Sequence, residues 1–107
     1  MTETPKPTVR TTRYEVSCLP PDNIDAFHFT ITVEWRGGDL WAVLRYGECL
    51  GTDGKWDYEP RPSNREDDWL DAHRFDLDTA LKLAQEEAPK ITVNGQTVAD
   101  VLRRAAS

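Results

Sequence analysis

The sequence predicts an α+β domain: an antiparallel sheet of about four strands in a meander, with two to three helices packed on one face. Up to residue 58, apolar and polar residues alternate with the period of two that is typical of strands. After residue 63, apolar residues recur at helical spacing. Because the strands precede the helices instead of alternating with them, an antiparallel sheet is favoured over parallel β-α-β units. The length of 107 residues fits one domain.

The chain is expected to begin with a tail. Residues 1–12 are rich in Thr and Pro and have no apolar pattern, which predicts a disordered segment. The domain is therefore expected to span residues 13–107. Tyr14, Val16 and Cys18 alternate with polar residues, which predicts a first strand that ends at Pro20–Pro21.

The segment from Phe27 to Trp35 is the clearest strand. Its apolar residues occupy every second position, so one face is expected to be core and the other solvated. These apolar residues are Phe27, Phe29, Ile31, Val33 and Trp35. The turn at Gly37–Gly38–Asp39 leads into a third strand over 40–46. That strand is apolar on both faces, which favours a central position in the sheet.

Residues 47–55 are predicted to reverse the chain, with Asp53–Gly54 as the strongest hairpin turn signal. Trp56 and Tyr58 then share one face of a short fourth strand. Pro60 and Pro62 are expected to end it, because proline cannot donate to the ladder.

Three helices follow. Ser63 with Glu66 three residues later has the spacing of a capping box, which predicts a short helix over 64–72. Asp76 is expected to cap the main helix over 77–88. Its apolar stripe is Leu77, Ala80, Leu81, Ala84 and Ala88. A tight turn at Asn94–Gly95 precedes Thr97, which is expected to cap a last helix over 98–105.

The segment from Asp53 to Asp78 concentrates the charge of the chain. Its nine acidic and four basic residues account for −5 of the formal net charge of −6, and it also holds Trp56, Tyr58 and Trp69. Acidic surfaces with aromatic anchors are typical of sites that meet a basic partner. We therefore expect a contact face for a protein with a basic surface. The candidate residues are Trp56, Tyr58, Arg61, Asp67, Asp68, Trp69, Asp71 and His73.

The acidic cluster has other interpretations. Asp67 and Asp71 lie four apart on the predicted helix, so their carboxylates share a face. They could start a solvated helix whose charge Arg65 and Arg74 partly neutralise, hold a hard cation such as Mg²⁺, or raise one another's pKa for acid–base work. We predict no metal site, because no recognised ligand spacing is present.

An enzymatic function has little support in the sequence. There is no nucleophile motif and no phosphate-binding loop, and no cofactor is predicted. The alternative of a small enzyme would use His73 with Asp71 or Asp76. His28 is expected to be exposed, whereas Cys18 and Cys49 are expected to be free and buried. The primary hypothesis is a non-enzymatic binding or regulatory module.

The charge also bears on partners and location. A net charge of −6 argues against direct binding of nucleic acid, which needs clustered Lys and Arg. A second alternative is a DNA mimic that inhibits a nucleic-acid enzyme. No apolar run approaches the ~20 residues that span a bilayer, and the N-terminus lacks a signal-peptide pattern, so a cytoplasmic protein is expected. It would be a monomer, or a homodimer through residues 27–35 if that strand lies at an edge.

Two segments of the chain resemble those of a known group of proteins. The segments WDYEPRPSNREDDWLDAHRFDLDTALKLA and ITVNGQTVADVLRRA resemble small α+β proteins of high-GC Gram-positive bacteria and their phages, over about residues 13–105. The resemblance implies a bacterial, cytosolic accessory protein, with a phage origin and dispensability for growth as part of that expectation. The family has no assigned activity, cofactor or catalytic residue, so the resemblance implies no reaction.

Overall fold

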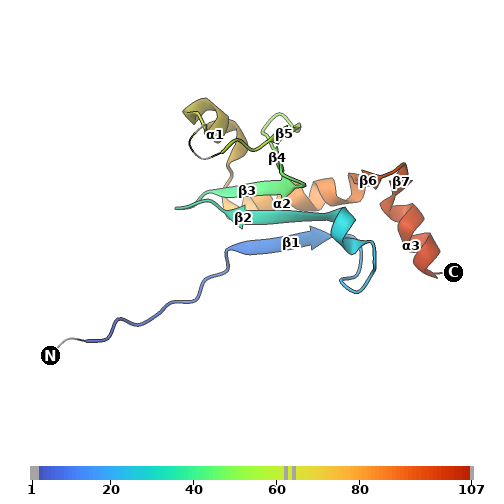
Figure 1. The fold of residues 1–107 in the computed structure, drawn as a ribbon, viewed down its shortest axis with the longest axis horizontal. Coiled ribbons are helices and arrows are strands. Elements are labelled where there is room, and N and C mark those ends of the chain that lie inside the picture. Colours follow the sequence, from blue (N-terminus) through green and yellow to red (C-terminus); the bar gives the residue numbers. More distant parts are fainter. Residues whose placement is uncertain (1–2, 62, 64, 107) are drawn as a thin grey trace.

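The structure is a computed structural model that describes residues 3–61, 63 and 65–106. It confirms an α+β chain with an antiparallel sheet, whose five strands follow the sequence order from β1 to β5 (Figure 1). The strands are β1 (Arg13–Ser17), β2 (Thr30–Trp35), β3 (Trp41–Arg45), β4 (Glu48–Leu50) and β5 (Trp56–Tyr58). The strand beyond the expected four is β4, which lies within the predicted reversal. Residues 3–12 have no regular secondary structure and extend away from the sheet.

The segment before β2 differs from the prediction. Residues Ala26–Phe29 form a 3₁₀ turn, η1, and the strand begins only at Thr30. Local hydrogen bonds hold the preceding chain in successive turns: Asn23 N donates to Pro20 O, Ala26 N to Asn23 O and His28 N to Asp25 O. These bonds take the backbone out of the ladder. The prediction that Phe27 faces the core is therefore wrong, since its side chain is 75% exposed.

The centre of the sheet agrees with the sequence. Gly37 and Gly38 both have positive φ, and Arg36 N donates to Leu40 O at 2.8 Å, which closes the β2–β3 turn. Four consecutive residues of β3, Trp41 to Leu44, are buried, which confirms the central position of this strand. Since β2 lies between β1 and β3, it is not an edge strand, and the edges are β1 and β5. Self-association through residues 27–35 at an edge is thereby excluded.

The predicted turn between β4 and β5 is present. Gly54 has a φ of +80°, and Gly51 N donates to Lys55 O at 2.9 Å. The helix that follows, α1 (Asp67–His73), begins later than the predicted residue 64. Glu66 occupies its N-cap position with extended backbone and no side-chain capping bond, so Ser63 does not cap it. Pro62 and Asn64, to which two predictions refer, lie outside the described residues.

The main helix, α2 (Leu77–Glu87), has the predicted cap, in which Asp76 Oδ1 accepts from Thr79 N at 3.2 Å. Its stripe of Ala80, Ala84 and Ala88 is buried, and the helix packs against β1, β2 and β3. Figure 1 shows α2 lying across one face of these strands.

The C-terminal part begins with a short 3₁₀ turn, η3 (Ala88–Lys90). A small hairpin, β6 (Thr92–Val93) and β7 (Gln96–Thr97), then leads into α3 (Val98–Ala106). The hairpin turns at Asn94 and Gly95, both of which have positive φ, as predicted. Within the described part of the chain, no helix is long and apolar enough to cross a bilayer.

The apolar residues form two clusters on opposite faces of the sheet. The larger includes Val33, Val43 and the alanine stripe of α2. The smaller consists of Ala42, Leu44 and Cys49, with Trp69 of α1 packed on it. Successive residues of a strand point to opposite faces, so Val43 and Leu44 belong to different sides. The prediction of helices on one face therefore holds for α2, whereas α1 covers the other face.

Candidate functional site

The structure divides the predicted contact face between two sides of the sheet. Trp56 is partly buried and packs on the larger cluster, whereas Trp69 packs on the smaller one. Tyr58 is 75% exposed, and Arg61 is exposed in the connection that follows β5. The other predicted residues lie together on α1: Asp67, Asp68, Trp69, Asp71 and His73. This helix brings together five of the eight predicted residues.

Trp69 attaches this helix to the sheet by packing on the smaller apolar cluster. Its indole ring stacks on the imidazole of His73, with 4.1 Å between ring centroids and 9° between ring planes. The guanidinium of Arg74 lies 5.3 Å from the centroid of the same indole. His73 Nδ1 is 2.7 Å from the carbonyl oxygen of Trp69. The indole is thus contacted from several sides and partly buried, so it holds α1 in a fixed position on the sheet.

A carboxylate surrounded by three arginines lies near Trp69. Glu59 accepts from Arg36 through both oxygens, at 3.1 and 3.0 Å. Arg74 reaches Glu59 Oε1 at 2.9 Å and Arg65 reaches it at 3.2 Å. The side chains of Glu59 and Arg74 are only 11% and 4% exposed. Arg36 directly follows β2, whereas Arg65 precedes α1 and Arg74 follows it. The cluster therefore fastens the α1 segment to the sheet.

The electrostatics of Glu59 follow from these contacts. Burial alone raises the pKa of its carboxyl group, but the hydrogen bond from Arg36 and the charges of the three guanidinium groups outweigh that effect. The pKa is therefore held below its ordinary value. Glu59 stays ionised and is in direct contact with the guanidinium groups of Arg36, Arg65 and Arg74.

The exposed acids of α1 lack such compensation. Asp67, Asp68 and Asp71 are all exposed, and among the described residues none of them has an ion pair. Arg65 and Arg74, which one interpretation of the sequence expects to neutralise part of this charge, form their ion pairs with Glu59 instead. The outer face of α1 consequently presents three exposed carboxylates without direct ion pairs among the described residues.

His73 is engaged in packing. Its ring is 8% exposed beneath Trp69, and no hydrogen bond joins it to Asp71 or Asp76 within the described part of the chain. Asp76 instead caps α2. These contacts disfavour the alternative in which His73 works with either carboxylate as an acid–base pair.

The two cysteines lie in different environments. Cys49 is buried against Arg74 and the carbonyl of His73, and burial raises the pKa of its thiol to about 11. Cys18 is exposed, so the prediction that both cysteines are buried is wrong for Cys18. No group of three or more His, Cys, Asp or Glu side chains within the described ranges could hold a metal ion.

A groove of about 770 Å³ lies over β1, β2 and β3 on the α1 side. Its hydroxyl groups are already bonded: Ser17 Oγ donates to Phe29 O at 3.1 Å and Thr30 Oγ1 to Ala26 O at 2.6 Å. Two exposed rings line it, Phe27 and Tyr46, and His28 Nδ1 is 2.7 Å from the Tyr46 hydroxyl. These exposed rings are not predicted by the sequence, because its alternating pattern places Phe27 in the core and His28 on a strand.

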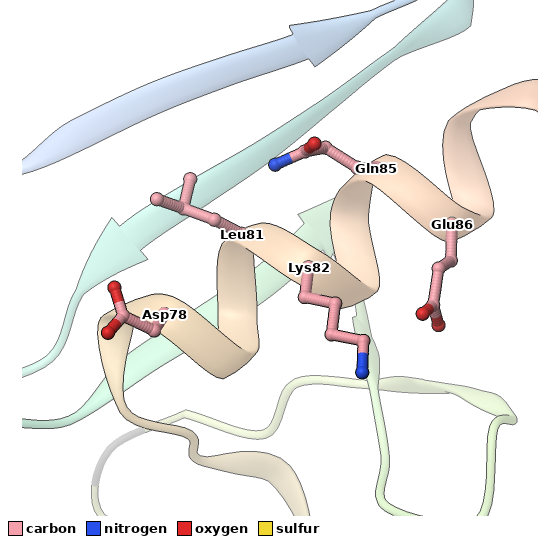
Figure 2. Close-up of a pocket in the computed structure, with 5 residues that line it drawn as sticks. All are labelled: Asp78, Leu81, Lys82, Gln85 and Glu86. Carbon is pink, nitrogen blue, oxygen red and sulfur yellow. The ribbon is translucent and has the colours of Figure 1, made fainter.

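A second depression, of about 420 Å³, lies on α2 (Figure 2). The five lining side chains all come from this one helix, and Asp78, Lys82 and Glu86 follow each other at intervals of one turn. Leu81 is partly buried and belongs to the packing of the larger cluster. This is an ordinary solvated helix surface without convergent polar groups.

The chain matches no protein-family model, no curated protein and no solved structure. The geometry of its own residues is therefore what supports a function.

Proposed function

We propose that this protein is a small, acidic, non-enzymatic protein-binding module that docks a basic protein surface through the outer face of α1. The observation that supports this proposal is the recruitment of Arg65 and Arg74 by Glu59. It leaves Asp67, Asp68 and Asp71 exposed without ion pairs among the described residues.

Rigidity under the acidic face supports the same function. Binding costs less free energy when the contacting surface is already ordered. Here the stacking of Trp69 on His73 and the Glu59 cluster hold both flanks of the short helix. Exposed surface charge without ion pairs mainly increases the rate of encounter and the selectivity for a partner of opposite sign. The complex is therefore expected to weaken as salt increases.

The proposed surface is smaller than the one expected from the sequence. Trp56 packs on the larger cluster, which also holds α2, so it does not contribute to the same face. Tyr58 is exposed on the short strand β5, and Arg61 is exposed in the following connection. The three aspartates of α1, with Glu66 directly before them, form the proposed contact.

The experiment compares three forms of the chain as bait in a bacterial lysate. One is unaltered, one carries Asp67→Asn, Asp68→Asn and Asp71→Asn, and the control carries Asp22→Asn, Asp78→Asn and Glu86→Gln. The control removes the same charge from other exposed positions. Proteins captured by the unaltered and control forms, released by salt and lost with the α1 variant, support the proposal. Retention by the α1 variant at unchanged salt sensitivity overturns it.

A further inference from the structure

β1 is an edge strand whose outer side is open (Figure 1). Within the part of the chain that the structure describes, β1 pairs only with β2. In an antiparallel ladder, successive residues direct their backbone N–H and C=O groups alternately to one side and the other. Trp35 N donates to Thr12 O at 2.9 Å, which assigns the even-numbered residues of this segment to β2. Arg13, Glu15 and Ser17 therefore direct their backbone groups outward.

We infer that β1 pairs antiparallel with β1 of a second copy of this chain, in the register centred on Tyr14. Only outward-directed residues of both copies can exchange hydrogen bonds. Among the registers that meet this condition, those centred on Arg13, Tyr14 or Glu15 place charged residues of the two copies opposite each other. A ladder centred on Arg13 places two arginines opposite each other, and one centred on Glu15 opposes two glutamates. Like charges directly opposite are destabilising.

The register centred on Tyr14 is complementary in charge. It sets Arg13 of each copy opposite Glu15 of the other, so the favourable pair occurs twice by symmetry. The two side chains are 58% and 66% exposed and now contact each other within the strand at 3.5 Å. They are therefore available for exchange between copies. Charged residues often protect an edge from pairing, but their order along β1 matches a reversed copy of itself.

The same register brings the two Tyr14 side chains together. Tyr14 pairs with itself at a position without backbone hydrogen bonds, where opposite side chains approach most closely. Its ring lies against Trp41, with 5.7 Å between centroids, so the contact extends an existing aromatic cluster. Thr11 and Thr12 would lie opposite Ser17 and Val16, and the ladder would contain about eight backbone hydrogen bonds. An interface of this size is weak, so the dimer depends on concentration.

Sedimentation velocity from about 1 µM to about 1 mM protein covers the affinities of such weak contacts. The unaltered chain is expected to form a dimer within this range. Glu15→Arg should remove the dimer, and the double change Arg13→Glu with Glu15→Arg should restore it, because exchanging the charges keeps them complementary. The control Glu86→Arg, an equal charge change on exposed α2, should leave the dimer intact.

Three outcomes overturn the inference: a monomer at all concentrations, a dimer unaffected by Glu15→Arg, or a double variant that stays monomeric. Circular dichroism of each variant checks that the fold is retained.

Hydrogen exchange adds an independent readout. The amides of Arg13, Glu15 and Ser17 should exchange at least about tenfold more slowly in the dimer, since they acquire partners there. The amides of Tyr14 and Val16, already bonded to β2, should change little. A change confined to Tyr14 and Val16 would exclude pairing through this edge.

Discussion

The ring planes of Trp69 and His73 are nearly parallel, 9° apart, and their centroids are separated by 4.1 Å. A carbonyl oxygen can only accept, so the 2.7 Å contact with Trp69 O places the proton of the neutral imidazole on Nδ1. The stack lies on the smaller apolar cluster, where Trp69 packs with Cys49 of β4. These two rings therefore join α1 to the sheet and determine the position of the acidic face.

Replacing the indole should weaken the attachment of α1 to the sheet. Trp69→Ala is expected to lower the free energy of unfolding by about 3 kcal/mol, because it removes the ring stack and opens a cavity over Ala42, Leu44 and Cys49. Trp69→Phe, which keeps a ring, should lose clearly less. Urea unfolding followed by circular dichroism measures both. Equal stability of the alanine variant and the unaltered chain would show that α1 is not fastened by this contact.

The Glu59 cluster should be equally important for stability. Glu59→Gln leaves Arg36, Arg65 and Arg74 without their shared carboxylate, and Arg74 is almost fully buried. Removing one partner of a buried ion pair is costly, so a loss of about 3 kcal/mol is expected. Glu48→Gln is a suitable control on the neighbouring strand, since Glu48 has no ion pair among the described residues. A cost no larger than that of the control would contradict the assignment.

The same carboxylate should make stability depend on pH. The folded-state pKa of Glu59 lies below its unfolded value, which is about 4.3 for a free glutamate. Its contribution is therefore fully present above that value and is lost as the pH falls through the lower, folded-state pKa. The difference in unfolding free energy between the unaltered chain and Glu59→Gln should shrink from pH 7 to about pH 3. A difference that stays constant over this range would disprove the linkage.

The sequence predicts those parts of the fold in which local chemistry decides the backbone. The Gly37–Gly38 turn, the cap at Asp76 and the turn at Asn94–Gly95 all form as expected. Phe27 shows the limit. Its position in an alternating pattern is the same as that of Ile31, but the turns between residues 20 and 28 remove it from the ladder. Such local hydrogen bonds compete with strand pairing without changing the apolar pattern.

The candidate site was predictable only in part. That Asp67, Asp68 and Asp71 are exposed follows from their charge and helical spacing. The separation of Trp56 from Trp69 depends on which face each ring enters, and a three-residue strand gives too short a pattern to decide this. The role of Glu59 was not predicted, because two of its partners, Arg36 and Arg74, lie 23 and 15 residues away along the chain. Their convergence is a consequence of the tertiary fold.

The packing around His73 leaves no room for a larger residue at Gly51. A methyl group added there would lie 3.2 Å from His73 Nε2 and 2.9 Å from Asp53 Oδ1. Because the imidazole is held by its stack, the contact must be relieved by Asp53, whose Oδ1 accepts from Lys55 N at 3.0 Å in the β4–β5 turn. Gly51→Ala should therefore cost about 1–2 kcal/mol. The double variant with Asp53→Ala should be less than additive. Full additivity in denaturant unfolding would show that Asp53 is not what yields.

The two thiols should differ strongly in reactivity. The thiolate is the reactive form, and with a pKa of about 11 roughly one Cys49 in a thousand is ionised at pH 8. Cys49 is also fully buried under Trp69, whereas Cys18 is exposed. Native protein treated with a maleimide or a disulfide reagent should therefore be modified quickly at Cys18 and slowly at Cys49, and at both sites in denaturant.

Since Cys49 is covered by Trp69 of α1, its labelling rate reports the opening of this helix from the sheet. Trp69→Ala should accelerate this slow step at least about tenfold, which corresponds to 1.4 kcal/mol of the lost stability, while Cys18 serves as the internal control. Equal slow-phase rates in the two proteins would mean that Cys49 is protected by something other than the helix.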